Sequence, residues 1–253
     1  MTSPNAVDFI CNVCGRAGSL PAESFDREAG LCPHCQSTVR ARSVIYLLTK
    51  YLLGEPRTLP SVPPAAFRGV GLSCAHSYAP YLEKIFHYTN TYFDHEPRLD
   101  ISHPANFHEL DFLISSDVFE HTFPPAIAAF QGASSILKPG GLLILSVPYT
   151  LNDRTVEHYP ECIDYEKVPQ ENGLVGVRLT FRDGSKRLDT KPVWHGGQGN
   201  TLEMRVYCRS HLFECLKNSS FEILEEFAYG VPHYGIITNL KETWSLPLAA
   251  RKL

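Results

Sequence analysis

The chain has 253 residues, which is long enough for one large domain or for one domain with a small appendage. Hydrophobic residues make up 43% and charged residues 20%, as in ordinary globular proteins, and no apolar run approaches the roughly 20 residues that span a bilayer. The formal net charge of −4 argues against a general nucleic-acid binder, which usually carries a basic surface.

Four cysteines near the start of the chain form two Cys-x-x-Cys pairs, with 17 residues between the pairs. Each pair presents two thiolates to one side of a turn, and two such turns complete a tetrahedral shell around zinc. Four thiolates leave no open coordination position, so the metal would be structural. A redox dithiol, or His34 in place of one cysteine, is the alternative. The sequence thus predicts a zinc knuckle over residues 1–40 with the ligands Cys11, Cys14, Cys32 and Cys35.

The same cysteines bear on the compartment. Thiols in metal-ligand spacing suit a reducing environment, and the N-terminal residues lack the charged and apolar regions of a secretory signal. We therefore expect a cytoplasmic protein without a membrane partner. The oligomeric state stays open.

A connecting helix and a linker are predicted over residues 41–62. Apolar side chains between Val44 and Leu52 recur at helical spacing and should pack the knuckle onto the main domain. Arg40 and Arg42 stand at the start of this helix, either as solvated arginines or as contacts to an anionic ligand or partner. A proline-rich connector then leads into a domain over residues 63–253.

Residues 111–148 carry the pattern of a parallel α/β sheet. The apolar runs 112–115 and 141–147 predict strands that helices cover on both faces. Between them, a helix should open at Pro124 and end before Gly140. Ligands of open α/β sheets bind outside the carboxyl ends of the strands, so we expect the chemistry at the turn 115–121.

This stretch resembles a known enzyme family. The sequence DVFEH at 117–121, followed by a helix and LKPGGLLILSVP, is similar to the fourth-strand and fifth-strand signature of class I S-adenosylmethionine-dependent methyltransferases of the small-molecule type. The resemblance covers residues 66–148, and more loosely the chain as far as residue 230. It implies a Rossmann-like α/β sheet with helices on both faces, and S-adenosylmethionine as the cofactor.

The resemblance also implies a set of cofactor-binding residues. The turn after the first strand keeps Gly71 of the family's glycine-rich pattern, and Ser73 stands where a second glycine would be. Asp94 would accept from both ribose hydroxyls, Asp100 from the adenine amino group, and Ile101 would cover the ring. No GxGxxG follows the first strand, which disfavours a NAD-type site. The predicted cofactor residues are Gly71, Ser73, Asp94, Asp100, Ile101, Ser116 and Asp117.

Residues 149–205 depart from the bare fold and are predicted to form a substrate lid. They contain a polar loop, a hairpin with Asp183 and Gly184 at its turn, and a glycine-rich loop beside His195. Insertions after the fifth strand lie over the crevice of the sheet. A helix and a strand within 210–227 and a last strand within 235–240 should complete the sheet.

Methyl transfer from a sulfonium needs alignment of the acceptor and, for some acceptors, one general base. Histidine has a pKa suited to that role. We predict His121 in the turn after the fourth strand, and His158 and His195 from the lid, with a structural or surface role as the alternative for each. No HxH or HxxxH spacing supports a second metal site.

Together these features predict a methyltransferase that O- or N-methylates a polar small molecule, such as a sugar or a natural-product intermediate. One alternative is an RNA or protein methyltransferase that docks its substrate through the zinc module. A basic stripe would favour it, formed by Arg16, Arg27, Arg40 and Arg42. The other alternative is a non-catalytic binding protein on the same scaffold.

Overall fold

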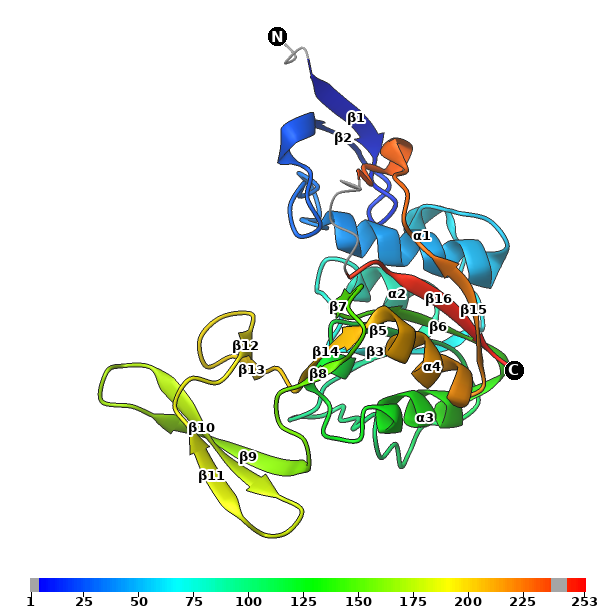
Figure 1. Ribbon diagram of the computed structural model, residues 1–253. Coiled ribbons are helices and arrows are strands. Elements are labelled where there is room, and N and C mark those ends of the chain that lie inside the picture. The colour runs from blue at the N-terminus through cyan, green and yellow to red at the C-terminus, as the bar shows by residue number, and fades with distance from the viewer. Residues whose placement is uncertain (1–4, 238–244) are drawn as a thin grey trace.

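The computed structural model describes residues 5–237 and 245–253, and six strands from these residues form the central sheet (Figure 1). Its order is β15-β16-β6-β5-β3-β4. β4, β3, β5 and β6 are parallel, and β16 is antiparallel to both of its neighbours. The strands are β3 (Arg68–Leu72), β4 (His87–Thr91), β5 (Leu110–Ser116), β6 (Leu137–Ser146), β15 (Phe221–Glu226) and β16 (Leu248–Lys252).

The chain enters this sheet at β3, one strand from the edge formed by β4. β3 pairs with β4 on one side and with β5 on the other. The chain thus first adds β4 at one side of β3 and then crosses to add β5 at the other side. The carboxyl ends of β3 and β5 therefore flank a topological switch point, where open α/β sheets bind ligands. This is the Rossmann-like α/β fold class that the sequence predicts.

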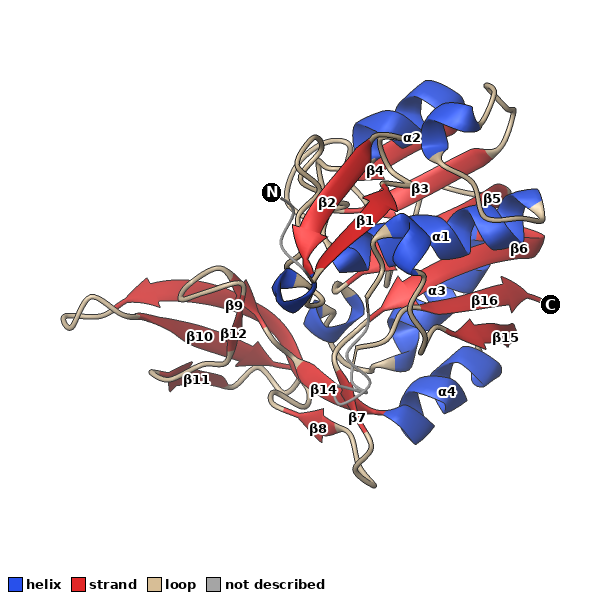
Figure 2. Cartoon of the chain, turned by 90° about the horizontal axis from the view of Figure 1, so that it is seen from above, coloured by secondary structure: helices blue, strands red, loops and turns tan. Residues whose placement is uncertain are grey.

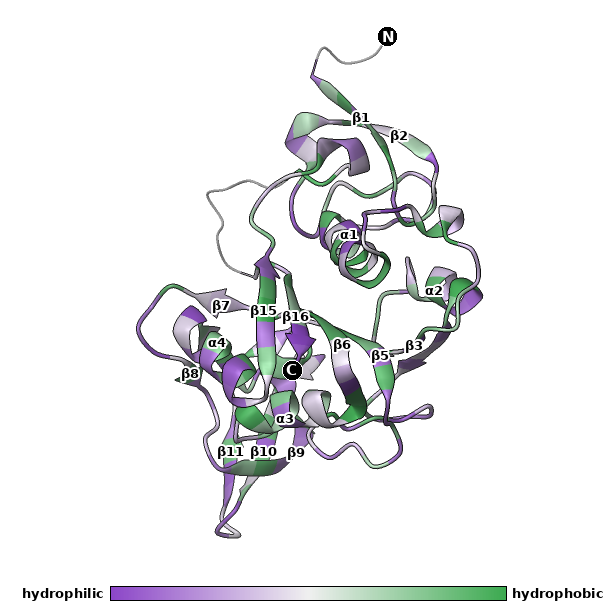
Figure 3. Cartoon of the chain, turned by 90° about the vertical axis from the view of Figure 1, so that its right-hand side faces the viewer, coloured by the Kyte–Doolittle hydropathy of each residue, from purple (hydrophilic) through white to green (hydrophobic). Residues whose placement is uncertain are grey.

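Helices cover both faces of the sheet (Figure 3). α1 (Val39–Leu53) and α2 (Ala79–Ile85) share one apolar core with Phe112 and Ile114 of β5. α3 (Ile127–Ile136) and α4 (Arg209–Asn218) share the other core with Leu113. Side chains of a strand alternate between its faces, so a strand buried on both sides must be apolar almost throughout.

The predicted strand–helix–strand unit is present, with shifted boundaries. α3 begins at Ile127, so Pro124 lies in the turn before the helix. β6 begins at Leu137, directly after α3. Gly140, with a φ of +78°, therefore lies within the first residues of the strand and bends it there. A positive φ costs glycine nothing, which explains its place in this tight turn.

The N-terminal module is not separated from the sheet. It consists of the hairpin β1 (Ala6–Ile10) and β2 (Ala17–Pro21), a short turn η1 (Ala22–Ser24) and the cysteine loops. Phe9 and Val13 belong to the same core as α1 and Phe112. α1 lies directly against β6 and β16, and η2 (Leu59–Ser61) leads from it to β3. The predicted connecting helix is thus a layer of the main domain.

The segment for which the sequence predicts a lid, named the lid below by its position alone, leaves the sheet after β6 and returns at α4 (Figures 1 and 2). The predicted hairpin is confirmed, with Gly184 at its turn at a φ of +83°. Three lid strands form a sheet in the order β11-β10-β9, which extends away from the body of the protein. The elements between β6 and α4 are β7 (Tyr149–Thr150), β8 (Val156–Glu157), β9 (Cys162–Pro169), β10 (Val175–Phe181), β11 (Lys186–Asp189), β12 (Trp194–His195), β13 (Thr201–Leu202) and β14 (Arg205–Cys208), and η3 (Phe119–His121) directly follows β5.

The end of the chain differs from the prediction. α4 and β15 are present as expected, and the last described strand of the sheet is β16, to which residues 235–237 do not belong. Residues 235–237 follow the short turn η4 (Pro232–Tyr234) and make a single bridge, from Ile236 to Val231, and residues 238–240 lie outside the described part. Within 5–237 and 245–253, no helix combines the length and the apolar character that a membrane crossing requires.

Candidate functional site

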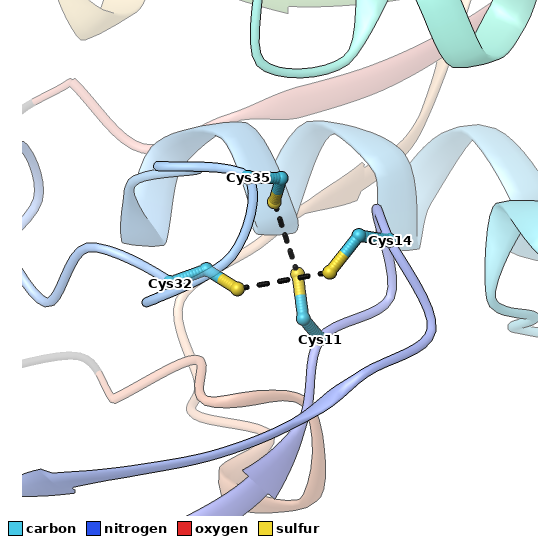
Figure 4. Close-up of side chains that lie close together, drawn as sticks. All are labelled: Cys11, Cys14, Cys32 and Cys35. Atoms are coloured by element: carbon cyan, nitrogen blue, oxygen red, sulfur yellow. Dashed lines mark hydrogen bonds between the residues drawn. The ribbon is translucent and has the colours of Figure 1, made fainter.

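Four cysteine side chains converge between the two N-terminal loops and the start of α1 (Figure 4). Their sulfur atoms all lie within 4.8 Å of one another. Cys11 Sγ is 3.7 Å from Cys35 Sγ, and Cys14 Sγ is 3.7 Å from Cys32 Sγ. All four are free thiols, and the short distances join cysteines of different pairs. The sequence prediction that the two Cys-x-x-Cys turns face each other is confirmed.

The two turns share one backbone pattern. The amide of Gly15 donates to Cys11 O at 2.7 Å, and the amide of Gln36 donates to Cys32 O at 2.9 Å. Gly15 has a φ of +73° and Gln36 a φ of +60°. Each turn is thus closed by a left-handed residue directly after its second cysteine. His34 is not part of the cluster, because its Nε2 contacts Ala17 O at 3.1 Å.

A buried guanidinium lies behind the cysteines. Arg42 is fully buried, and its side chain donates to the carbonyl oxygens of Ser37, Gly30 and Gly235. Its guanidinium also lies over the ring of Phe9, 5.1 Å from the centroid. Among the described residues no carboxylate forms an ion pair with Arg42. Burial lowers the pKa of Arg42, and the charges of the four nearby cysteines act against that shift.

Two other arginines of the module reach the carboxyl edge of the sheet. Arg27 Nη2 donates to Asp117 Oδ1 at 2.7 Å, and Arg27 Nη1 donates to Asp117 Oδ2 at 2.9 Å. Arg40 Nη1 donates to Ser116 Oγ at 2.6 Å and lies 3.4 Å from Asp117 Oδ2. Glu28 accepts from both arginines. The N-terminal module therefore closes over the ends of β5 and β6.

The strand ends are arranged to receive these arginines. Asp117 has a φ of +57°, a left-handed conformation that aspartate tolerates better than most residues. Ser146, at the end of β6, donates to Asp117 Oδ1 at 2.9 Å and contacts Ser116 Oγ at 3.0 Å. Burial acts to raise the pKa of Asp117, but the hydrogen bonds and charges of Arg27 and Arg40 outweigh it and lower that pKa below its usual value.

These contacts show whether the arginines of the module form the exposed basic stripe that a macromolecular substrate would require. Arg42 is buried behind the cysteines, while Arg27 and Arg40 turn inward to carboxylates. Only Arg16 of the four arginines is exposed on the module. The basic stripe that would favour a macromolecular substrate is therefore not formed on this surface. Asp117 and Ser116 are the predicted cofactor residues that the structure brings to one cluster.

The turn after β3 is open to solvent at its tip. Ser73 is exposed and has a φ of +49°. This left-handed conformation is one that glycine adopts most easily, and glycine is the residue that the resemblance leads one to expect at this position. Gly71 lies below it in the core. A side chain at Gly71 would place Cβ 1.8 Å from Tyr88 Oη and 2.5 Å from Cys74 Sγ, so packing alone requires glycine there.

The remaining predicted cofactor residues lie apart from Asp117. Asp94 follows β4 by three residues, with 82% of its side chain exposed, and accepts from His95 Nδ1 at 2.7 Å. Asp100 caps its own loop by accepting from Ser102 N at 2.9 Å. Ile101 is 3% exposed and belongs to the core that it shares with α3, so its side chain points away from the surface.

The predicted histidines lie where the lid meets the end of β5. His121 Nε2 is 3.7 Å and His195 Nδ1 is 3.3 Å from Oε1 of Glu120, which is fully buried. Burial raises the pKa of Glu120, and contact with Glu120 raises the pKa of His195. His158 belongs to a second pair, with its Nε2 3.0 Å from Glu203 Oε1. The structure thus joins His121 to His195 and pairs His158 separately.

Two hollows, of about 450 Å³ and 510 Å³, lie away from these residues. The first is lined by Phe9 and neighbouring residues of the N-terminal hairpin, and the second by Phe181 and its neighbours in the lid. At the carboxyl edge of β5 and β6, the side chains of Arg27 and Arg40 cover the strand ends. The edge beyond β3 and β4, with Ser73 and Asp94, is exposed.

The sequence did not predict the roles of three contributors to this region: Arg27, Ser146 and Glu120. Arg27 lies in an irregular loop between the cysteine pairs, 90 residues before its partner Asp117, and no local pattern links the two. Ser146 ends an apolar strand. Glu120 belongs to the DVFEH turn, but the sequence did not predict that it is buried, because a glutamate in a turn is usually exposed.

No family model and no curated protein matches the chain. Solved structures with a similar fold include an S-adenosylmethionine-dependent methyltransferase from Clostridium acetobutylicum, at 16% identity and a TM-score of 0.46, covering 75% of this chain and 85% of that one. Another is the 1,6-didemethyltoxoflavin-N1-methyltransferase of Burkholderia thailandensis, at 14% identity and a TM-score of 0.46, covering 85% and 78%. A methyltransferase from Mesorhizobium loti has 16% identity and a TM-score of 0.45, covering 81% and 98%. Similarities at this level leave the activity to be argued from the site.

Proposed function

We propose that the chain is an S-adenosylmethionine-dependent methyltransferase that acts on a polar small molecule. The charge pattern at the switch point carries this proposal. Two guanidinium groups, Arg27 and Arg40, and one carboxylate, Asp117, meet at the carboxyl end of β5. The amino-acid part of the cofactor is a zwitterion, so its carboxylate suits the arginines and its ammonium group suits Asp117.

The exposed edge beyond β3 and β4 suits the adenosine part. The carboxylate of Asp94 is open to solvent, and its two oxygens can accept from a vicinal diol. The turn at Ser73 exposes backbone where a ligand approaches the end of β3. Asp100 is the candidate acceptor for the adenine amino group, with Ile101 holding that loop in the core. Ser116 would line the same site beside Arg40.

The chemistry needs little from the protein beyond alignment. When bound, the cofactor supplies an activated methyl group for in-line displacement by the acceptor. The protein's residues hold the acceptor in position, exclude water, and take a proton from it where needed. His158 is a candidate for that task, and its ring is held in place by Glu203, whose Oε1 lies 3.0 Å from Nε2. His121 and His195 lie beside the buried carboxylate of Glu120.

We also propose that the four cysteines hold a structural zinc ion. In a tetrahedral zinc–thiolate site, metal–sulfur bonds of about 2.3 Å place the sulfurs about 3.8 Å apart. The cross-pair distances of 3.7 Å fit this geometry. The buried Arg42 suits the net negative charge of such a unit. Because the module carries Arg27, the metal would also position the arginines at the sheet edge.

The lid favours a polar acceptor with oxygen or nitrogen as the methylated atom, such as a sugar or a natural-product intermediate. Histidines and carboxylates line its junction with the sheet. A macromolecular substrate is the weaker reading, because Arg42 is buried and Arg27 and Arg40 point toward the sheet edge, which leaves only Arg16 of the four exposed on the module. The other alternative is a non-catalytic binding protein on the same scaffold, and a measurement of cofactor binding distinguishes it from the enzyme.

Calorimetric titration with S-adenosylmethionine tests the proposal. Wild type should bind, and Asp94→Ala should weaken the affinity by about tenfold or more, because a carboxylate with two hydrogen bonds to the ligand is lost. Asp183→Ala is the matched control, since Asp183 is an equally exposed aspartate in the lid hairpin. Absence of binding at millimolar cofactor would refute the function, and equal affinity of both variants would refute the role of Asp94.

A further inference from the structure

One buried cluster is not explained by the alignment of cofactor and acceptor. Glu120 and His121 come from η3, directly after β5, and His195 comes from β12 in the lid. One ligand atom from each of the three side chains lies within 4.8 Å of the others. The cluster therefore joins the end of β5 to the lid.

The carboxylate of Glu120 lacks the partners that burial demands. Its side chain is fully buried, and neither of its oxygens has a hydrogen-bond donor in the described chain. Both imidazole contacts of Oε1, 3.3 Å to His195 and 3.7 Å to His121, lack the distance or alignment of a hydrogen bond. Buried carboxylates are normally satisfied by donors or by a metal ion, so this one calls for a positive partner.

The orientation of His121 points the same way. Its Nδ1 is 2.8 Å from the carbonyl oxygen of Leu202, which can only accept, so Nδ1 carries a proton. In the neutral ring, the Nε2 lone pair then faces Glu120 Oε1, and two acceptors face each other at 3.7 Å. Metal-binding histidines typically have this outer contact to a carbonyl, which fixes the ring and leaves the other nitrogen for the ion.

The distances suit a shared cation better than a shared proton. Ligand atoms that each lie about 2.1 Å from an ion at tetrahedral angles are about 3.4 Å apart. The contacts of Glu120 Oε1, at 3.3 Å and 3.7 Å, bracket that value. A proton held between histidine and carboxylate would instead draw one nitrogen to within about 3 Å of the oxygen.

We propose that Glu120, His121 and His195 bind a divalent transition-metal ion. Two imidazoles and one carboxylate suit ions such as Zn²⁺, Mn²⁺ or Fe²⁺, and three protein ligands leave positions open. These positions would accept water or an oxygen of the methyl acceptor, a role that rests on the proposed function. The site differs from the cysteine cluster in every ligand, so the two ions are distinguishable by spectroscopy.

Titration of the full-length, metal-stripped protein with Co²⁺ tests the proposal. Wild type should take up two equivalents, one with the intense charge-transfer absorption of cobalt thiolate and one with only weak visible bands. Glu120→Gln and His195→Ala should each weaken binding of the second equivalent by at least about a hundredfold and leave the thiolate band unchanged. His195 is partly exposed in the lid, so its variant should fold even if the Glu120 variant does not.

His87→Ala is the matched control, because His87 is exposed at the opposite end of the parallel strands and should leave both equivalents intact. Uptake of one equivalent by wild type, or a second equivalent that survives both substitutions, would overturn the site. Calorimetry with S-adenosylmethionine on the same samples separates the two proposals. Cofactor binding without a second cobalt equivalent contradicts only the metal site, and the reverse result contradicts only the methyltransferase assignment.

Discussion

The pairing of Arg27 with Asp117 is the contact that connects the cysteine module to the sheet edge, and a double-mutant cycle measures it. The variants are Arg27→Gln, Asp117→Asn and the combination of both. Two charge-assisted hydrogen bonds, of 2.7 Å and 2.9 Å, are lost in each single variant. Asp117 has a side chain that is 7% exposed and Arg27 one that is 27% exposed, so solvent screens the pair only in part.

The magnitude follows from these values. Hydrogen bonds to charged groups contribute about 1.5–3 kcal/mol each, and removal of one partner from a buried ion pair costs about 3–5 kcal/mol. The partial exposure of Arg27 places Asp117→Asn at the lower end, about 3 kcal/mol. Because Arg40 also contacts Asp117, part of that cost persists without Arg27. We expect a coupling energy of about 2 kcal/mol between the two positions.

Urea unfolding monitored by circular dichroism measures the cycle, with the m-value as the check that all variants unfold in the same way. The exposed pair of Arg182 and Glu161 in the lid is the control, with an Nε–Oε2 distance of 3.0 Å and a coupling close to zero. A coupling between Arg27 and Asp117 below about 0.5 kcal/mol, the range of exposed pairs, would refute the view that the module is fastened to the edge by this contact.

Two further predictions concern the same edge and the turn beside it. The pKa of Asp117 is lowered in the folded protein, so its contribution to stability is present above the unfolded pKa and is lost as the pH falls through the folded value. The difference in unfolding free energy between wild type and Asp117→Asn should therefore shrink below about pH 4, and a difference that stays constant from pH 7 to pH 3 would contradict this. Gly71→Ala should destabilise the protein by about 1–3 kcal/mol, because its Cβ would meet Tyr88 Oη at 1.8 Å. Tyr88→Phe should restore part of that loss in urea unfolding, because it removes Oη but leaves Cys74 Sγ at 2.5 Å from the new Cβ. No recovery at all would show that the contact with Tyr88 Oη is not a cause of the loss.

Much of the fold was predictable because local patterns encode it. Continuous apolar runs marked β5 and β6, since strands covered on both faces have no polar side to show. The spacing of the cysteines marked their cluster, because a Cys-x-x-Cys turn presents both sulfurs to one side. By contrast, β16 has only three buried residues, and its pairing partners lie far away in the chain. A strand of that kind leaves no periodic signal long enough to detect.

The candidate site was predictable only in part. The DVFEH turn was identified, and the structure places Asp117, Glu120 and His121 at the carboxyl edge of β5. The partners of these residues came from elsewhere: Arg27 from the module and His195 from the lid. Such pairs are set by how separate elements pack. The order of residues along the chain does not record that packing.

The sequence by itself therefore determined the types of element, the two Cys-x-x-Cys turns and the turn that holds the acidic residues, because each depends on neighbours within a few positions. Only the tertiary structure decided that Arg42 lies buried behind the sulfurs, that Arg27 and Arg40 cover the ends of β5 and β6, and that Glu120 is buried between two histidines. The physical reason is that the charge environment of a side chain depends on burial and on partners brought together by folding, and these arise from packing between distant segments.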